Sequence, residues 1–325
     1  MITFYFNEHS WRIKFPDLND NLTVEFGLSE INRLVEHEKT ISDKNVINKL
    51  IESFASDGFL HPILVTEMKN RYVIADGTHR LFALREISLK QGRQVYAPLN
   101  ILKEPFFKRD SWVFYFNRKI DLQTILDAGF TLTRVNPSNL NEAVARVLNG
   151  EFQGLIKSGG EFFSIQREAH TREDFLKSLK ELDEILGNYD KLVLREEFNI
   201  GTGEMAFIAP PVDDKGDIRI LVENSGLRRR KASRTVVKLR PLFLDVPLNI
   251  LLSDFEDVEK YIIEKIEWLI FNKKILLVKP PVADLDFCGD AFDHPLLIMN
   301  KDVFYRKSGF KKSFENQIIE DYKIL

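Results

Sequence analysis

Tyr72-Val73-Ile74-Ala75-Asp76-Gly77-Thr78-His79-Arg80 is the stretch that decides the fold of the N-terminal part of this chain. Its apolar first half ends at Asp76-Gly77, and a second apolar segment begins at Leu81. This pattern predicts a buried strand, a tight turn and the start of a helix. A helix N-terminus presents backbone N–H groups and the positive end of the helix dipole, an arrangement that suits phosphate.

The polar residues of this turn allow two interpretations. In the first, His79 and Arg80 add donors and positive charge to an anion site, and Asp76 supplies the opposite charge that a metal–nucleotide site needs. In the second, the same residues form an Asx-type turn and a capped helix, with a structural role only. The turn by itself does not separate these alternatives.

The segments around the turn predict a compact α/β unit over residues 1–105. Apolar residues at three- and four-residue spacing predict an amphipathic helix over 44–57, which Gly58 ends. The remaining predicted elements of this unit are a strand or hairpin within 1–21, strands at 61–66, 72–75 and 95–102, and a helix over 78–88.

The rest of the chain, residues 106–325, is predicted to form a second, larger domain that contributes to the substrate pocket. We expect helices at 122–128, 140–148, 172–186 and 254–271, and strands at 162–166, 218–222, 235–244, 275–278 and 296–300. These elements do not alternate regularly, so the predicted fold class is α+β.

Composition limits the function classes. The chain has 325 residues and a net charge of −3. This negative net charge argues against DNA as the main partner, but it is compatible with a local basic patch. The single cysteine, Cys288, excludes an intrachain disulfide and a cysteine-rich zinc site. The sequence shows neither a signal-peptide pattern nor an apolar run of membrane-spanning length, so the expected location is the cytoplasm, with no membrane partner.

A second motif, His37-Glu38, precedes the helix predicted over 44–57. Together with the segment from Gly58 to Val65 and the Asp76–Arg80 turn, it resembles the ParB/sulfiredoxin-like superfamily. The resemblance is closest to its free L-serine kinase branch, in particular to the bacterial serine kinases that are encoded together with staphyloferrin B siderophore synthesis. It is strongest over residues 30–102, and weaker matches continue at Ser111-Trp112, Ala232-Ser233-Arg234 and Val246-Pro247-Leu248.

The resemblance implies a kinase that phosphorylates free L-serine to O-phospho-L-serine with Mg²⁺ and either ATP or ADP. It makes Glu38 the general base for the serine hydroxyl, and gives Asp76 the role of orienting the hydroxyl or holding the metal. Gly77 would let the backbone approach the phosphates, which Thr78, His79 and Arg80 would bind. The product would feed cysteine, siderophore or related amino-acid synthesis.

The amino-acid substrate needs further anchors, for which the resemblance offers Trp112, Ser233 and Arg234. Arg234 is the candidate for the carboxylate or the transferred phosphate, and Trp112 for an apolar wall. Trp112 has a structural alternative, because it lies in an apolar run typical of a core strand. The basic run Arg228-Arg229-Arg230-Lys231 next to Arg234 is typical of a solvated loop.

Two relatives predict other activities. Sulfiredoxin repair needs a cysteine nucleophile where this chain has Thr78, so that chemistry is excluded. A ParB-like nucleotide-binding regulator or DNA-binding module, without turnover of a small molecule, is the main alternative to the kinase. A scaffold that keeps only the fold is a third, against which the presence of both Glu38 and Asp76 argues. The sequence leaves open the phosphate donor, serine against threonine or homoserine, and the oligomeric state.

Overall fold

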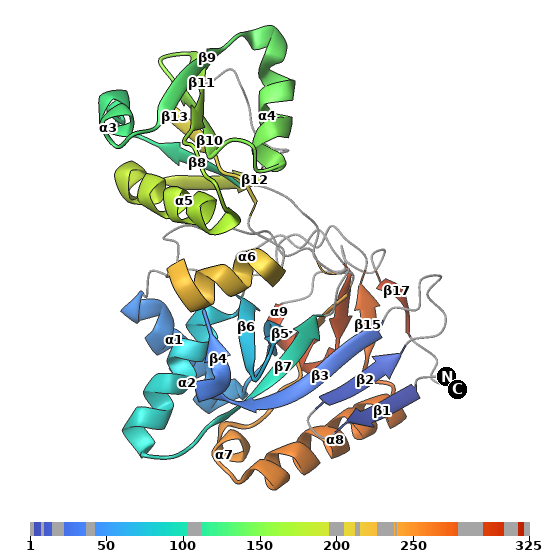
Figure 1. The fold of residues 1–325 in the computed structure, drawn as a ribbon. Coiled ribbons are helices and arrows are strands. Elements are labelled where there is room, and N and C mark those ends of the chain that lie inside the picture. Colours follow the sequence, from blue (N-terminus) through green and yellow to red (C-terminus); the bar gives the residue numbers. More distant parts are fainter. Residues whose placement is uncertain are drawn as a thin grey trace. The chain divides into compact units, whose positions relative to one another are not determined.

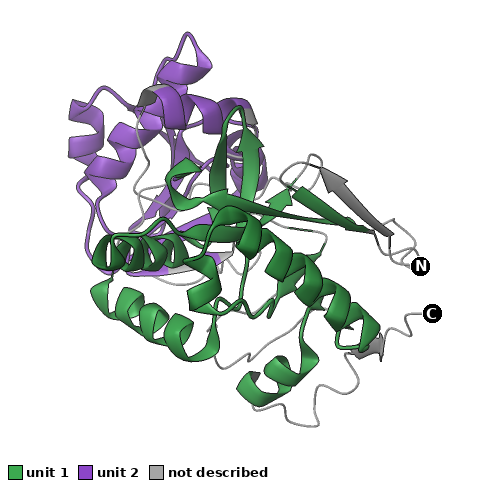
Figure 2. Cartoon of the chain, turned by 90° about the horizontal axis from the view of Figure 1, so that it is seen from below, with its two compact units in different colours: residues 1–35, 42–106, 236–325 green, residues 36–41, 107–235 purple. Residues whose placement is uncertain are grey.

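The computed structural model describes residues 3–7, 10–14, 23–36, 43–102, 112–194, 205–211, 215–225, 237, 239–278, 295–308 and 318–321. The chain divides into two compact units (Figures 1 and 2). The first consists of Met1–Val35, Ser42–Phe106 and Val236–Leu325, and the second of Glu36–Ile41 and Phe107–Thr235. The structure therefore differs from the predicted division at 105, because the last part of the expected C-terminal domain belongs to the first unit.

The first unit is built on a large mixed sheet with the strand order β1-β2-β3-β7-β5-β6-β4. The pairs β4–β6 and β5–β7 are parallel, and the other neighbours are antiparallel. The hairpin predicted within 1–21 is confirmed by β1 and β2. The strands are β1 (Thr3–Asn7), β2 (Ser10–Lys14), β3 (Thr23–Glu30), β4 (Leu34–Val35), β5 (Ile63–Met68), β6 (Arg71–Asp76) and β7 (Tyr96–Leu102), with a 3-10 turn at Ile31–Arg33.

Two helices of the first unit pack together, and both follow the predicted pattern. Helix α1 (Lys44–Asp57) begins at Asp43, whose Oδ1 accepts the N–H of Asn45 at 2.8 Å, and ends at Gly58 with φ 77°. Helix α2 (Thr78–Gln91) begins directly after Gly77 and ends at Gly92 with φ 61°. The predicted strand–turn–helix is thus confirmed as β6, Gly77 and α2.

The C-terminal segment joins the first unit because it shares that unit's core. Val258, Ile262, Ile266 and Leu269 lie at helical spacing on α8 and belong to the same buried cluster as Val65 of β5. The elements of this segment are α7 (Leu248–Leu251), α8 (Phe255–Phe271), α9 (Lys301–Ser308), and a second sheet of order β14-β16-β15-β17, formed by β14 (Arg240–Leu242), β15 (Leu276–Val278), β16 (Leu296–Ile298) and β17 (Ile318–Asp321).

Backbone contacts fix the start of this segment against the chain that leads into β5. Phe59 and Val246 form an antiparallel bridge, and the N–H of Leu244 donates to the carbonyl of Leu60 at 2.7 Å. These contacts bring β14 next to the start of β5, although about 180 residues separate them in sequence.

The two faces of the central strands differ in chemistry. Alternate residues such as Ile63 and Val65 of β5 enter the hydrophobic cluster. The opposite face carries Thr66 and Asn100, and the register aligns Asn100 and Asp76 with Leu64 between them. Both polar residues are buried, and Thr66 Oγ1 and Asn100 Nδ2 have no hydrogen-bond partner within the described part of the chain. Asp76 therefore stands at the edge of a face that is partly polar.

The second unit contains a sheet of order β12-β8-β13-β10-β11-β9, with antiparallel neighbours throughout. Its strands are β8 (Trp112–Phe116), β9 (Thr131–Val135), β10 (Gly154–Ser158), β11 (Glu161–Gln166), β12 (Lys191–Leu194) and β13 (Met205–Ile208). Its helices are α3 (Leu122–Asp127), α4 (Leu140–Leu148), α5 (Arg172–Leu186) and α6 (Lys215–Ile220), with a 3-10 turn at Pro137–Asn139. The helices predicted here are confirmed, as is the α+β class.

Two predicted strands need correction. The strand at 218–222 is wrong, because these residues lie in α6 and the π-helical turn Leu221–Ser225. A short apolar run is ambiguous, and the buried residues Ile218 and Leu221 follow helical spacing. The strand at 235–244 is reduced to β14, since Phe243 adopts a positive φ of 62° and residues 235, 236 and 238 lie outside the described part.

Among the helices that the structure describes, none combines the length and the apolar character needed to cross a membrane.

Candidate functional site

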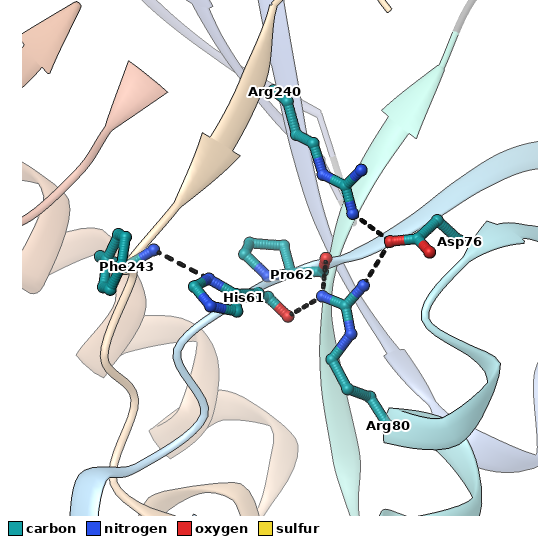
Figure 3. Close-up of polar contacts among 6 residues, drawn as sticks. All are labelled: His61, Pro62, Asp76, Arg80, Arg240 and Phe243. Atoms are coloured by element: carbon teal, nitrogen blue, oxygen red, sulfur yellow. Dashed lines mark hydrogen bonds and ion pairs between the residues drawn. The ribbon is translucent and has the colours of Figure 1, made fainter. Parts of the chain in front are cut away.

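The Asp76–Arg80 turn brings a carboxylate and two guanidinium groups together (Figure 3). Asp76 is the last residue of β6, and its Oδ2 accepts a hydrogen bond from Nη2 of Arg80 at 2.6 Å. The same oxygen also accepts from Nη2 of Arg240, which comes from β14. Charge-assisted bonds of this type are stronger than neutral ones. The site therefore joins two segments of the first unit that are far apart in sequence.

Arg80 is held by backbone as well as by Asp76. Its Nη1 donates to the carbonyls of His61 and Pro62, at 2.7 and 2.9 Å. The guanidinium side chain is only 12% exposed, so its position is set by these contacts rather than by solvent. Arg80 lies in the first turn of α2, and its cation therefore sits beside the N-terminus of that helix.

Gly77 makes this close arrangement possible. Its φ of 107° lies in the region that residues with a side chain rarely adopt, and a Cβ there would stand 2.8 Å from Nη2 of Arg80. As the N-cap residue, glycine provides no capping side chain. The turn thus depends on glycine for its backbone conformation and for the space that the guanidinium fills.

His61 connects the turn to the C-terminal segment. Its Nδ1 accepts the N–H of Phe243 at 3.3 Å, and the imidazole contacts the Phe243 ring edge-on, with 4.9 Å between ring centres. Burial of the imidazole, together with the positive charges of Arg80 and Arg240, keeps the pKa of His61 well below its ordinary value of 6.5. His61 is therefore neutral at pH 7 and serves as a hydrogen-bond acceptor.

This lowered pKa predicts a loss of stability in acid. The unfolded chain takes up a proton on His61 as the pH falls below about 6.5, while the folded chain resists it, so stability falls with the pH down to the folded pKa. We expect a slope of up to about 1.4 kcal/mol per pH unit from this group. The free energy of unfolding can be measured with urea at about pH 5 and about pH 7.5. The difference between the two values should be smaller for His61→Asn, which has no titrating ring, than for the unchanged chain.

The control for this measurement is His170→Asn. The side chain of His170 is 82% exposed, so its replacement makes the same chemical change away from a buried position. An equal pH dependence for His61→Asn and the unchanged chain would show that His61 does not resist protonation in the folded state.

The predicted site residues fall into three groups. Asp76, Gly77, Thr78, His79 and Arg80 lie together at the end of β6 and the start of α2. Trp112 begins β8 in the second unit, where it packs against a hydrophobic cluster, as its structural alternative predicts. The remaining three, Glu38, Ser233 and Arg234, lie outside the described residues, as do the basic run at 228–231 and Cys288.

Sequence reasoning missed Arg240. This residue lies inside a predicted strand between Leu239 and Pro241, with no motif around it. A single arginine flanked by buried residues is the available signal, because a charged residue in such a position usually has a partner. The identity of that partner, Asp76, depends on tertiary structure.

The described residues contain no group of three or more histidine, cysteine, aspartate or glutamate side chains able to hold a metal ion. A magnesium site made of one carboxylate and phosphate oxygens needs no such group. Asp76 fits that simpler role in its chemistry and its partial exposure. Because its Oδ2 accepts from two arginines, a metal would bind there together with phosphate groups that take over those donors.

Part of the sequence and the fold are similar to known proteins. Residues 17–99 match the ParB N-terminal domain. The fold is similar to that of C-terminally truncated SbnI from Staphylococcus aureus, with a TM-score of 0.57 and 17% identity over 74% of this chain and 95% of that one. A mutant free serine kinase in complex with ADP gives a TM-score of 0.49 and 22% identity, covering 70% of this chain and 93% of that one.

A conserved hypothetical protein from Pyrococcus furiosus gives a TM-score of 0.46 and 23% identity, over 70% of this chain and 97% of that one. The search of curated proteins found no match. The turn at Asp76–Arg80 lies inside the residues that match the ParB N-terminal domain.

Proposed function

We propose that this protein is a kinase of free L-serine, which transfers a phosphate from ATP or ADP to the serine hydroxyl. The observation that carries the proposal is the Asp76–Arg80 turn, where two guanidinium groups and a helix N-terminus meet in a ParB-like domain. Phosphoryl transfer asks a protein mainly for positioning and for stabilisation of negative charge. This arrangement supplies both.

The residues of the turn divide the work. Arg80 is fixed by two carbonyls and binds phosphate oxygens, together with the N–H groups of the first turn of α2. Thr78 and His79 lie in the same turn and add a hydroxyl and an imidazole. Asp76 orients the serine hydroxyl or holds Mg²⁺. When bound, Mg²⁺ neutralises phosphate charge. Glu38 accepts the proton of the serine hydroxyl as the hydroxyl oxygen attacks the phosphate.

The sequence motifs support serine as the substrate, through the resemblance of His37-Glu38 and the Asp-Gly-Thr-His-Arg turn to the free serine kinase branch. Trp112, Ser233 and Arg234 are the proposed contacts of the amino acid. Discrimination between serine and threonine rests on one methyl group, worth about 1–3 kcal/mol in a closed pocket.

The experiment is incubation of the protein with serine, Mg²⁺ and either ATP or ADP, followed by phosphorus NMR. We expect a phosphoserine signal with at least one donor. When threonine or homoserine replaces serine, the signal of the corresponding phosphorylated amino acid should be weaker. Separate reactions with the two nucleotides identify the donor. Folded protein that forms no phosphoserine with either nucleotide contradicts the proposal.

A regulatory nucleotide-binding module is the second candidate, favoured by the match of residues 17–99 to the ParB N-terminal domain. Such a module would bind nucleotide without phosphorylating serine. If it acts on DNA, its affinity for DNA should fall steeply with salt concentration. Nucleotide binding measured beside the NMR assay therefore separates the two candidates.

A further inference from the structure

Among the described side chains that contact Asp76, positive charges outnumber the single carboxylate. Asp76 contributes one negative charge, Arg80 and Arg240 contribute one positive charge each, and His61 is neutral. The N-terminal end of α2 adds a partial positive charge. A phosphate with two or more negative charges complements two guanidinium groups better than one carboxylate does.

The Arg80 side chain and the Arg240 backbone are held by contacts that do not involve Asp76. The carbonyls of His61 and Pro62 accept from Arg80, as described above. Arg240 is positioned by its backbone, because β14 pairs with β16 and its N–H donates to the carbonyl of Pro295 at 3.1 Å. The Arg80 guanidinium can therefore keep its place when the carboxylate moves, and the fixed backbone of Arg240 keeps the base of that side chain at the site.

Exposure points to the carboxylate as the exchangeable member of the cluster. The Asp76 side chain is 43% exposed, whereas those of Arg80 and Arg240 are 12% and 18% exposed. An incoming anion meets Asp76 from the solvent side, and a short aspartate side chain changes rotamer more easily than two anchored arginines change position.

We propose that Arg240 is a phosphate-binding residue of this site, and that the incoming phosphate displaces Asp76 from Arg240 and Arg80. The inference rests on the proposed function, since it specifies how the nucleotide phosphates of that site are held. Displacement also leaves the Asp76 carboxylate without its two guanidinium partners at the moment when phosphate is present, which suits the proposed role of Asp76 toward hydroxyl or metal.

The test is a double-mutant cycle on anion binding. Calorimetry would measure the affinities of ADP and of inorganic pyrophosphate for the unchanged chain, Arg240→Gln, Asp76→Asn and the double variant. EDTA is present throughout, so that loss of a metal ligand does not enter the result. Arg240→Lys accompanies Arg240→Gln as a variant that keeps the charge, and thermal unfolding checks that each protein is folded.

We expect Arg240→Gln to weaken both ligands about 10- to 100-fold, both in the otherwise unchanged chain and in the Asp76→Asn background. Asp76→Asn should strengthen pyrophosphate binding about 3- to 10-fold, because the competing anion is gone. Arg240→Lys should fall between Arg240→Gln and the unchanged chain. The matched controls in the same unit, Arg33→Gln and Asp57→Asn, should leave both affinities unchanged.

Two results with the variants would overturn the inference. If Arg240→Gln has no effect once Asp76 is replaced by its neutral amide, Arg240 only positions Asp76. If Asp76→Asn weakens anion binding without metal, Asp76 is not a displaced competitor. Failure of the unchanged chain to bind either ligand removes the inference, and it removes the proposed function as well if ADP also fails to bind with Mg²⁺. Binding as expected without phosphoserine formation removes the kinase alone.

Discussion

Replacing Glu38 with glutamine is expected to slow phosphate transfer to serine about 10²- to 10⁴-fold, the range of a lost general base. Glutamine has nearly the same shape as glutamate but cannot accept the hydroxyl proton. Because this loss concerns the attacking serine, the affinity for ADP should stay within about threefold of that of the unchanged chain. The rate is measured by phosphorus NMR and the affinity by calorimetry.

Glu38 and Asp76 follow paired residues of two strands at the same distance in sequence. Strand β4 runs parallel to β6, with Val35 opposite Val73. Asp76 follows Val73 by the same number of positions as Glu38 follows Val35, and so short a segment spans at most about 11 Å. The choice of Glu38 itself rests on the sequence motif, since this residue lies outside the described part of the chain.

Glu36→Gln is the matched control, since it changes a neighbouring carboxylate to the same amide. It should leave the rate within about threefold of the unchanged chain, well short of the loss expected for a general base. If Glu38→Gln protein is folded, binds ADP and transfers phosphate at the unchanged rate, another group accepts the proton, and the resemblance has misled us at this position.

Local patterns were enough to predict the strand, turn and helix around Asp76. The spacing of apolar residues defined α1, and the change from an apolar run to Asp76-Gly77 marked the end of β6. Glycine at the turn is required by a φ of 107°, so its presence in the sequence carried structural information. These features depend on neighbours in sequence, and they also contain most of the candidate site.

Features that depend on distant residues were not predictable in this way. The contact between Arg240 and Asp76 arises because Phe59 and Leu60 pair with the chain that follows β14. The residues near Arg240 in sequence do not predict that pairing. The division into units was also not predictable. Helix α8 joins the first unit through a shared core, and the sequence has no linker-like composition that would mark the boundary.

Replacing Gly77 with alanine is the second change with a large expected effect, a fall of about 100-fold in the rate of phosphate transfer. The added Cβ would lie 2.8 Å from Nη2 of Arg80 and 3.0 Å from its Cζ. Relief requires the guanidinium to leave the His61 and Pro62 carbonyls or the turn to distort. Either response displaces a phosphate-binding group by about 1 Å, enough for a loss of this size.

Gly92→Ala separates this effect from backbone strain. Gly92 ends the same helix with a positive φ of 61°, but a Cβ there meets nothing within 4 Å. It should therefore cost about 1–2 kcal/mol of unfolding free energy and leave the rate unchanged. Gly77→Ala should lower the rate as well as the stability, and adding Arg80→Ala to it should cost little more, because the function of Arg80 is already lost. A Gly77→Ala protein that loses stability alone would show that the turn tolerates the methyl group, and that the position of Arg80 does not limit transfer.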